Sequence, residues 1–191
     1  MPIIPAFEIG LWNAWIPLLC LELLSNIVRL RCKEAYKKMG NPSDMTLSKT
    51  EKRIGIIATL LYYLVLIYAI FLPLQLGTVW FYTGLAIFFL GLMMGVIAMA
   101  NFTAAPLDAP ITKGLYRYSR HPIYLAWFLV FLGTGAASAS WVLLLIAIVF
   151  KILTYFTAIT EERFCLEKYG DTYREYMNRT PRWIGIPKSG K

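Results

Sequence analysis

The sequence contains few of the residues that most often build metal and redox centres. It has one histidine, His121, and three cysteines, Cys20, Cys32 and Cys165, in 191 residues. A single imidazole cannot supply both axial ligands of a bis-histidine haem, and no motif points to Met or Tyr ligation. An odd, widely spaced set of cysteines indicates neither a disulfide framework nor a metal site. The dinucleotide-binding pattern Gly-x-Gly-x-x-Gly is also missing, which argues against a soluble nucleotide-binding domain.

Charged residues are scarce, because they make up 16% of the chain while hydrophobic residues make up 58%. Ordinary soluble domains contain about 45–50% apolar residues. The apolar residues here form uninterrupted runs, and a helix crosses a bilayer with about 20 such residues. We therefore expect five transmembrane helices, near residues 11–28, 54–76, 79–99, 123–137 and 141–160.

Basic residues are missing from every second segment between these runs. All but Lys151 of the 19 Lys and Arg residues lie in segments 29–53, 113–120 and 163–191, whereas segments 1–10, 75–78 and 138–140 have none. Lys and Arg accumulate on the cytoplasmic side of membrane proteins and are attracted to anionic lipids. The pattern predicts a multi-pass protein with its N-terminus outside and its C-terminus in the cytoplasm. A nucleic-acid-binding protein would not sort its formal charge of +8 in this way, so no nucleic-acid partner is expected.

These features predict an all-α integral membrane fold in one domain, residues 1–191. Residues 1–100 form a part with three helices, and residues 101–191 form a second part that ends in a cytoplasmic amphipathic helix. Small residues at 133–140 allow close helix approach, and Ser48 and Glu51 have the spacing of a capping box. Apolar side chains of the last segment either cover a pocket or lie in the headgroup layer; they are Phe164, Leu166, Tyr169, Tyr173 and Tyr176.

One polar cluster lies on the cytoplasmic side after the third run. Residues 114–124 read Gly-Leu-Tyr-Arg-Tyr-Ser-Arg-His-Pro-Ile-Tyr. Pro122 suits the first turn of the fourth helix. Arg120 and His121 then lie at a helix N-terminus, whose partial positive charge favours a carboxylate or a phosphate. The alternative is that Arg117 and Arg120 are topology signals and the tyrosines form an interfacial belt.

A second cluster is the acidic pair Glu161 and Glu162, at the end of the fifth run. Adjacent carboxylates repel one another, and at a helix C-terminus they face the negative end of the dipole. The dipole objection weakens if the helix continues into the tail. Otherwise the pair needs a cation from the protein or from a ligand. The alternative is an ordinary charge-rich helix next to the membrane.

Together the two clusters match the chemistry of S-adenosylmethionine. Its carboxylate suits cationic donors at a helix N-terminus, and its ammonium and ribose hydroxyls suit paired carboxylates. Its sulfonium cation is attracted to the faces of tyrosine rings. The sequence therefore predicts a cofactor site at the membrane face, built from Tyr116, Arg120, His121, Tyr124, Glu161 and Glu162.

Both clusters, with Tyr-Gly-Asp-Thr-Tyr-Arg-Glu-Tyr-Met at residues 169–177, resemble the isoprenylcysteine carboxyl methyltransferase family. More broadly they resemble the membrane phospholipid methyltransferase superfamily. The resemblance covers about residues 101–182, and the first two helices carry no family signature. It implies a membrane enzyme whose cofactor pocket is built from the segments that hold His121, Tyr124, Glu161 and Glu162. It also implies a lipophilic or prenylated acceptor that enters laterally between helices.

One departure from the family pattern concerns this acceptor. Members that methylate prenylcysteine carboxylates usually have Arg about four residues before the acidic pair, where this chain has Thr157. Lys151 lies nearly two helical turns earlier, about 9 Å away. It could bind a carboxylate acceptor in place of that Arg, pair with Glu22, or extend to the interface. The missing Arg favours another lipophilic acceptor, such as a phospholipid amine.

Methyl transfer from a sulfonium requires the nucleophile about 3–3.5 Å from the methyl carbon, with water excluded. A carboxylate needs no base, whereas an amine must first lose a proton. We predict Glu162 as this base and Glu161 as a cofactor ligand, or the reverse. The predicted activity is O- or N-methyl transfer to a lipid or lipid-linked acceptor. The alternatives are an isoprenylcysteine carboxyl O-methyltransferase specifically, or a non-catalytic membrane protein that retains the fold.

Overall fold

The computed structural model describes residues 7–31, 47–106 and 108–187. In these ranges β pairing is limited to a bridge between Asn13 and Pro73, so the predicted all-α class is confirmed for the described residues. The helices are α1 (Trp15–Arg31), α3 (Lys49–Ile70), α4 (Val79–Ala104), the short 3-10 helix η2 (Gly114–Arg117), α5 (Pro122–Ala137), α6 (Trp141–Tyr169) and α7 (Asp171–Arg179).

Three helices are long and apolar enough to cross a membrane: α3 with 22 residues, α4 with 26 and α6 with 29. The shorter helices α1 and α5, with 17 and 16 residues, are also apolar. Large hydrophobic side chains stay exposed along α3, as expected for a surface that faces lipid; they include Ile56, Leu60, Leu64 and Ile67. These are the features of an integral membrane protein, and a crossing by all five helices stays a prediction.

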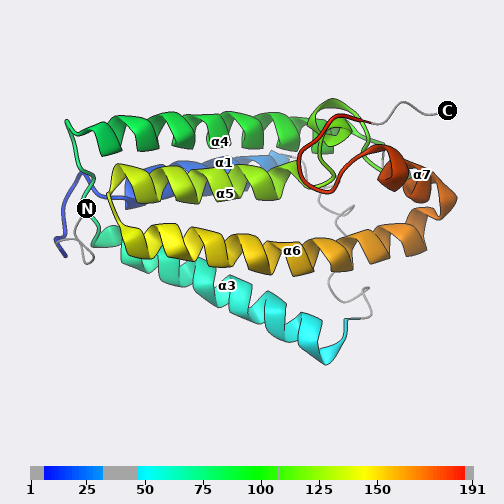
Figure 1. Ribbon diagram of the computed structural model, residues 1–191, viewed down its shortest axis with the longest axis horizontal. Coiled ribbons are helices and arrows are strands. Elements are labelled where there is room, and N and C mark those ends of the chain that lie inside the picture. The colour runs from blue at the N-terminus through cyan, green and yellow to red at the C-terminus, as the bar shows by residue number, and fades with distance from the viewer. Residues whose placement is uncertain (1–6, 32–46, 107, 188–191) are drawn as a thin grey trace.

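The helices lie side by side, with α5 between α4 and α6 and with α3 against α6 (Figure 1). The α4 and α5 backbones approach closely at Gly84, where an added Cβ would lie 2.2 Å from the Ala137 nitrogen and 2.5 Å from the Gly133 carbonyl oxygen. The small residues of the segment 133–140 therefore permit close packing, as predicted, and part of this packing is against α4. The core between the helices includes Phe88, Val130, Phe131, Leu143 and Phe150.

The end of the bundle opposite α7 is closed by hydrogen bonds. The Asn13 amide Nδ2 donates to the carbonyls of Glu8 at 2.6 Å and Ile70 at 2.7 Å. The Ala14 N–H donates to the Leu72 carbonyl at 2.8 Å. Helix α1 consequently begins at Trp15 rather than at residue 11, because the preceding residues pair with the link between α3 and α4.

At the other end, the predicted capping box is confirmed. The Ser48 hydroxyl accepts from the Glu51 N–H at 3.2 Å, and the Glu51 carboxylate accepts from the Ser48 N–H at 2.8 Å. The same carboxylate accepts from the Thr160 hydroxyl at 2.9 Å and forms an ion pair with Arg163 at 2.9 Å. The start of α3 is thereby attached to the C-terminal half of α6.

Helix α6 does not end at residue 160 but continues to Tyr169, and the chain breaks at Gly170 before α7. Glu161 and Glu162 consequently lie within a helix, and the predicted conflict with its dipole does not arise. Consecutive helical residues project about 100° apart around the axis. The two carboxylates therefore point in different directions and have different surroundings.

Candidate active site

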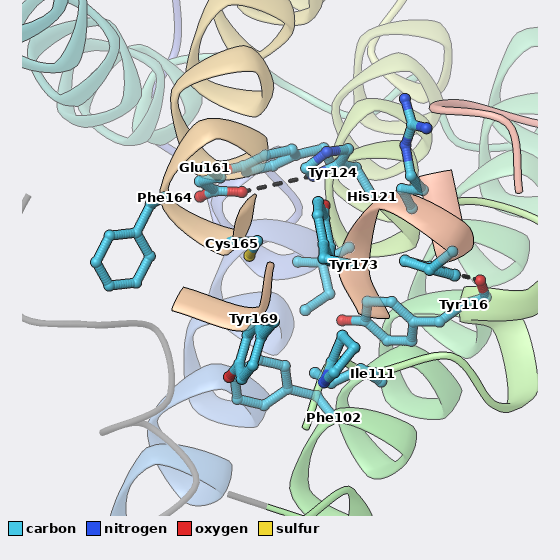
Figure 2. Close-up of a pocket in the computed structure, with 14 residues that line it drawn as sticks. Phe102, Ile111, Tyr116, His121, Tyr124, Glu161, Phe164, Cys165, Tyr169 and Tyr173 are labelled. Atoms are coloured by element: carbon cyan, nitrogen blue, oxygen red, sulfur yellow. Dashed lines mark hydrogen bonds and ion pairs between the residues drawn. The ribbon is translucent and has the colours of Figure 1, made fainter. Parts of the chain in front are cut away.

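A pocket with a volume of about 160 Å³ lies where η2, α7 and the ends of α4, α5 and α6 meet (Figure 2). Five of the predicted site residues line it: Tyr116, Arg120, His121, Tyr124 and Glu161. Glu162, Lys151 and Thr157 are not among the lining residues. The other side chains of the lining are Phe102, Pro110, Ile111, Ile123, Phe164, Cys165, Tyr169, Tyr173 and Tyr176.

The segment before α5 is held against the end of α4. The side-chain oxygen of Asn101 accepts from the Leu115 N–H at 2.9 Å. Gly114 has a φ of +63°, and a Cβ there would lie 2.0 Å from the same oxygen, so a larger residue would push η2 away from α4. This placement turns Tyr116 into the pocket wall, where it is buried and its carbonyl accepts from the Tyr176 hydroxyl at 2.7 Å.

Tyrosine side chains form much of the lining, and Figure 2 shows Tyr116 and Tyr173 across the pocket from Cys165 on α6. Burial raises the pKa of Tyr116, Tyr173 and Tyr176 above the usual value of 10. Their hydroxyls therefore stay neutral, and the pocket offers aromatic faces with uncharged polar groups. Phe164, Tyr169, Tyr173 and Tyr176 line the pocket, as one of the two alternatives predicted, whereas Leu166 is not among the lining residues.

Glu161 presents a carboxylate to the pocket. Its Oε1 accepts from the Tyr124 hydroxyl at 2.5 Å, and its Oε2 lies 3.5 Å from Nδ1 of His121. The side chain nevertheless keeps 37% of its exposure. Two neighbours thus orient the carboxylate and leave it accessible to a ligand.

Glu162 is not among the residues that line the pocket, and its side chain is only 4% exposed. Its Oε1 accepts from Nε of Arg120 and from Nε of Arg182, both at 3.0 Å, and its Oε2 accepts from Nη2 of Arg182 at 2.8 Å. Two guanidinium groups favour the ionised carboxylate and occupy its lone pairs. A general base requires the opposite environment, so this geometry argues against the predicted base role of Glu162.

His121 links the two carboxylates. It is buried, its Nε2 lies 3.1 Å from Glu162 Oε1, and its ring stacks on Tyr124 with the centroids 5.7 Å apart. Burial lowers the pKa of the His121 imidazole. The hydrogen bonds and charges of Glu161 and Glu162 together raise this pKa by more than burial lowers it. The net pKa is therefore above the usual 6.5, which favours an imidazolium that donates from both nitrogens.

Arg120 contributes to the pocket lining, and much of its hydrogen bonding goes to the protein itself. Besides Glu162, it donates from Nη1 to the carbonyls of Met177 at 2.9 Å and Thr180 at 3.2 Å. These carbonyls belong to the C-terminal end of α7, where a cation is favourable. Arg120 therefore fastens α7 over the pocket.

Residues 180–185, called here the C-terminal strap, contain two site residues that the sequence reasoning missed. Arg182 completes the pairing of Glu162, and Trp183 lies beside His121 with the ring centroids 5.9 Å apart. The strap is attached by hydrogen bonds from the Arg120 N–H to the Pro181 carbonyl and from the Gly185 N–H to the Tyr118 carbonyl, both at 3.1 Å. Arg182 and Trp183 lie five and six residues after the motif at 169–177, where the sequence pattern alone shows Arg182 only as one of the basic residues of the tail.

The two predicted substrate residues lie away from the pocket lining. The Thr157 hydroxyl donates to the Leu153 carbonyl of its own helix at 3.2 Å. The Lys151 Nζ is buried, 3.0 Å from the centroid of the Trp183 ring. Lys151 does not extend to the interface, since its ammonium is buried. It does not pair with Glu22 either, because no ion pair among the described residues joins the two.

Comparison with known proteins shows that part of this chain is similar to methyltransferases. The chain is 34% identical over 79 residues to the protein-S-isoprenylcysteine O-methyltransferase of Schizosaccharomyces pombe, a match that covers 40% of this chain and 32% of that enzyme. It is 37% identical over 73 residues to methanethiol S-methyltransferase 1 of Bradyrhizobium diazoefficiens, covering 38% of this chain and 25% of that enzyme. The match thus spans a third or less of the length of these relatives.

Both relatives are methyltransferases, which confirms the resemblance predicted from the two polar clusters. A broader match covers most of the described bundle, from the residue before α1 to the residue after α7. Residues 14–180 fit the family described as "Protein of unknown function (DUF1295)", and the chain belongs to this family.

Proposed function

We propose that this protein is an S-adenosylmethionine-dependent methyltransferase that acts on a lipophilic acceptor at the cytoplasmic membrane face. The observation that carries the proposal is the accessible carboxylate of Glu161, oriented by Tyr124 and His121 in a pocket lined with tyrosines. The activities named for the two relatives support the same reaction class.

The residues present fit the charges of the cofactor. Its ammonium and sulfonium groups are cations, which suit the Glu161 carboxylate and the faces of Tyr116 and Tyr124. Its carboxylate suits the guanidinium of Arg120, which lines the same pocket, since both ring nitrogens of His121 already face Glu161 and Glu162. When bound, the cofactor supplies an electrophilic methyl group.

The chain's own residues bind, orient and exclude water in this proposal. Glu161 is the cofactor ligand, and Tyr124 and His121 hold its carboxylate in place. Glu162 is a positioning residue, because it fixes His121 and neutralises Arg120 and Arg182. The tyrosines of α7 close the pocket against water, which an in-line displacement requires.

The test is cofactor binding by the detergent-purified protein, measured by calorimetry, with neighbouring isosteric variants as a matched pair. We expect Glu161→Gln to weaken S-adenosylmethionine binding by about 10- to 100-fold with only a small loss of melting temperature, because a charge-assisted contact to the ligand is lost. We expect Glu162→Gln chiefly to lower the melting temperature. This change leaves two guanidinium groups without their anion, which in buried pairs costs about 3–5 kcal/mol.

Two results would contradict the proposal. A folded wild-type protein that does not bind the cofactor, with or without added lipid, would favour a non-catalytic membrane protein that retains the fold. A Glu161→Gln variant that binds as tightly as the wild type would remove Glu161 from the cofactor site.

A further inference from the structure

Lys151 is a cation buried in the apolar part of α6. Its Nζ has no hydrogen-bond partner among the described residues, and its contact is with the face of the Trp183 indole. Cation–π attraction satisfies the charge in part, but it uses none of the hydrogen-bond directions of an ammonium. Ionisable groups inside a membrane are costly and usually pair with an opposite charge. The environment of Lys151 is therefore suited to an anion.

Trp183 places this cation next to the candidate active site. The indole contacts Lys151 on one side and lies 5.9 Å from the His121 ring and 6.4 Å from the Tyr155 ring, measured between centroids. The preceding Arg182 is anchored on Glu162 and lies over Tyr155 at 5.3 Å. Trp183 thus spans the distance between Lys151 and the wall of the cofactor pocket.

The surroundings indicate that the anion belongs to a molecule from the lipid phase. Neighbouring side chains on α6, Ile148, Ile152 and Phe156, are large, apolar and exposed. A water-soluble anion would have to cross this apolar surface, whereas the apolar part of a lipid can lie against it. Lys151 lies in the helix that also carries Glu161 and Glu162, so an acceptor bound there would lie along the same helix as the cofactor site.

The contacts of Glu161 and Glu162 favour an acceptor that is already an anion when it binds. Two guanidinium groups occupy its carboxylate, and Glu161 is held by Tyr124 and His121. An amine acceptor would need one of these carboxylates as a base, whereas an anionic nucleophile needs none. The expectation of a phospholipid amine, drawn from Thr157, is therefore not the one that the geometry supports.

We propose that Lys151 binds the anionic group, a carboxylate or a phosphate, of a membrane-embedded acceptor. Trp183 is the cover of this site: the C-terminal strap holds its indole on the ammonium, and the indole moves aside when an anion pairs with Lys151. The role of the bound molecule as a methyl acceptor rests on the function proposed above. The anion site itself does not.

The test uses two matched pairs of lipid probes, at a pH at which both acids are ionised. Oleate is compared with oleyl alcohol, and lysophosphatidic acid with monoacylglycerol, by displacement of a fluorescent fatty-acid probe from the detergent-purified full chain. We expect the wild type to bind the anionic member of at least one pair about 10-fold more tightly, which corresponds to about 1.4 kcal/mol. The pair with the larger preference distinguishes a carboxylate from a phosphate.

The variants assign this preference to Lys151. Lys151→Met is expected to reduce it to less than about twofold and to leave neutral lipids unaffected, while Lys151→Arg retains it. Lys52→Met removes an exposed lysine at the start of α3 and is expected to behave as the wild type. Trp183→Ala is expected to bind the anionic lipids more tightly than the wild type, because no cover has to be displaced. If Lys151→Met does not fold, Lys151→Gln takes its place.

Cofactor binding, measured on the same samples, separates this inference from the proposed function. Anion preference that depends on Lys151 in a protein that does not bind S-adenosylmethionine would overturn the proposed function and leave the anion site. Cofactor binding without anion preference, or with a preference that survives in Lys151→Met, would overturn the anion site. Unchanged affinity in Trp183→Ala would overturn the role of Trp183 as a cover.

Discussion

Glu161 and Glu162 are neighbours in the chain, yet they have different surroundings. The first keeps an accessible carboxylate in the pocket, and the second is buried among Arg120, His121 and Arg182. The cause is the helical geometry, which points consecutive side chains about 100° apart. An acidic pair in α6 can therefore supply one ligand-binding group and one structural anchor. His121 contacts both carboxylates, one through each ring nitrogen.

The raised pKa of His121 predicts how stability varies with pH. The folded protein holds the imidazole proton more tightly than the unfolded chain does, because Glu161 and Glu162 face the ring from α6. The resulting stabilisation is complete below the unfolded value of 6.5 and is lost as the pH rises through the higher folded value. The loss is about 1.4 kcal/mol for each pH unit in which only the folded state is protonated.

The stabilisation by the His121 proton is measured as the difference in melting temperature between the wild type and His121→Gln across that pH range. We expect the difference to shrink as the pH rises. The other groups near the ring, Arg120, Tyr124 and Trp183, are present in both proteins and cancel in the comparison. A difference that is constant or grows with pH would show that the carboxylates do not raise the pKa.

At the scale of helices, two features build the site: the continuation of α6 to Tyr169, and the close packing of α5 on α4. The extra turns of α6 carry Glu161, Cys165 and Tyr169 to the pocket (Figure 2). The packing of α4 on α5 sets the position of the His121 end of α5 relative to the end of α4, where Asn101 holds η2. The pocket therefore depends on glycines that lie far from it.

We expect Gly84→Ala to destabilise the protein by about 1–3 kcal/mol, as overpacking of a close contact usually does. The added Cβ would lie 2.2 Å from the Ala137 backbone nitrogen, and backbone cannot move aside as a flexible side chain can. Gly55→Ala in α3 is the matched control, because a Cβ there meets nothing within 4 Å. It should be neutral or stabilising by up to about 1 kcal/mol, since alanine favours helices. Thermal unfolding in detergent measures both, and equal melting temperatures for the two variants would contradict the packing argument.

For the molecule as a whole, α7 and the C-terminal strap lie at one end of the bundle, and the α3–α4 and α5–α6 links lie at the other (Figure 1). The pocket is at the α7 end, since Tyr173 and Tyr176 of α7 line it. Among the described residues, the basic start of α3, the segment 113–120 and the end of α6 with α7 lie at the pocket end. The positive-inside rule then predicts that the pocket faces the cytoplasm. Such a placement gives the pocket access to a water-soluble cofactor while its helices contact the lipid phase.

This orientation is testable with single cysteines in variants that lack Cys20, Cys32 and Cys165. In sealed right-side-out vesicles, a membrane-impermeant maleimide should label Leu76→Cys, in the link between α3 and α4, and should spare Lys113→Cys, next to η2. Detergent permeabilisation should expose both, which controls for reactivity. Labelling of Lys113→Cys in sealed vesicles would show that the pocket end faces outward.

The sequence by itself determined the helical class, the approximate helices and the capping box, because each depends on local information. Through the chemistry of two short motifs it also pointed to five of the residues that line the pocket. Apolar runs, Pro122 at the first helical position and the Ser48–Glu51 spacing act within a few residues. Helix ends were less predictable. Helix α6 continues past the apolar run, where Glu162 pairs with Arg120 and Arg182 from other parts of the chain.

Only the tertiary structure decided which groups neutralise one another. Glu162 meets Arg120 from 42 residues earlier and Arg182 from 20 residues later, and Lys151 meets Trp183 of the C-terminal strap rather than Glu22. Charge in an apolar environment must be compensated by whatever group the fold brings near. A list of charged residues does not contain that information, since their pairing depends on how the helices pack.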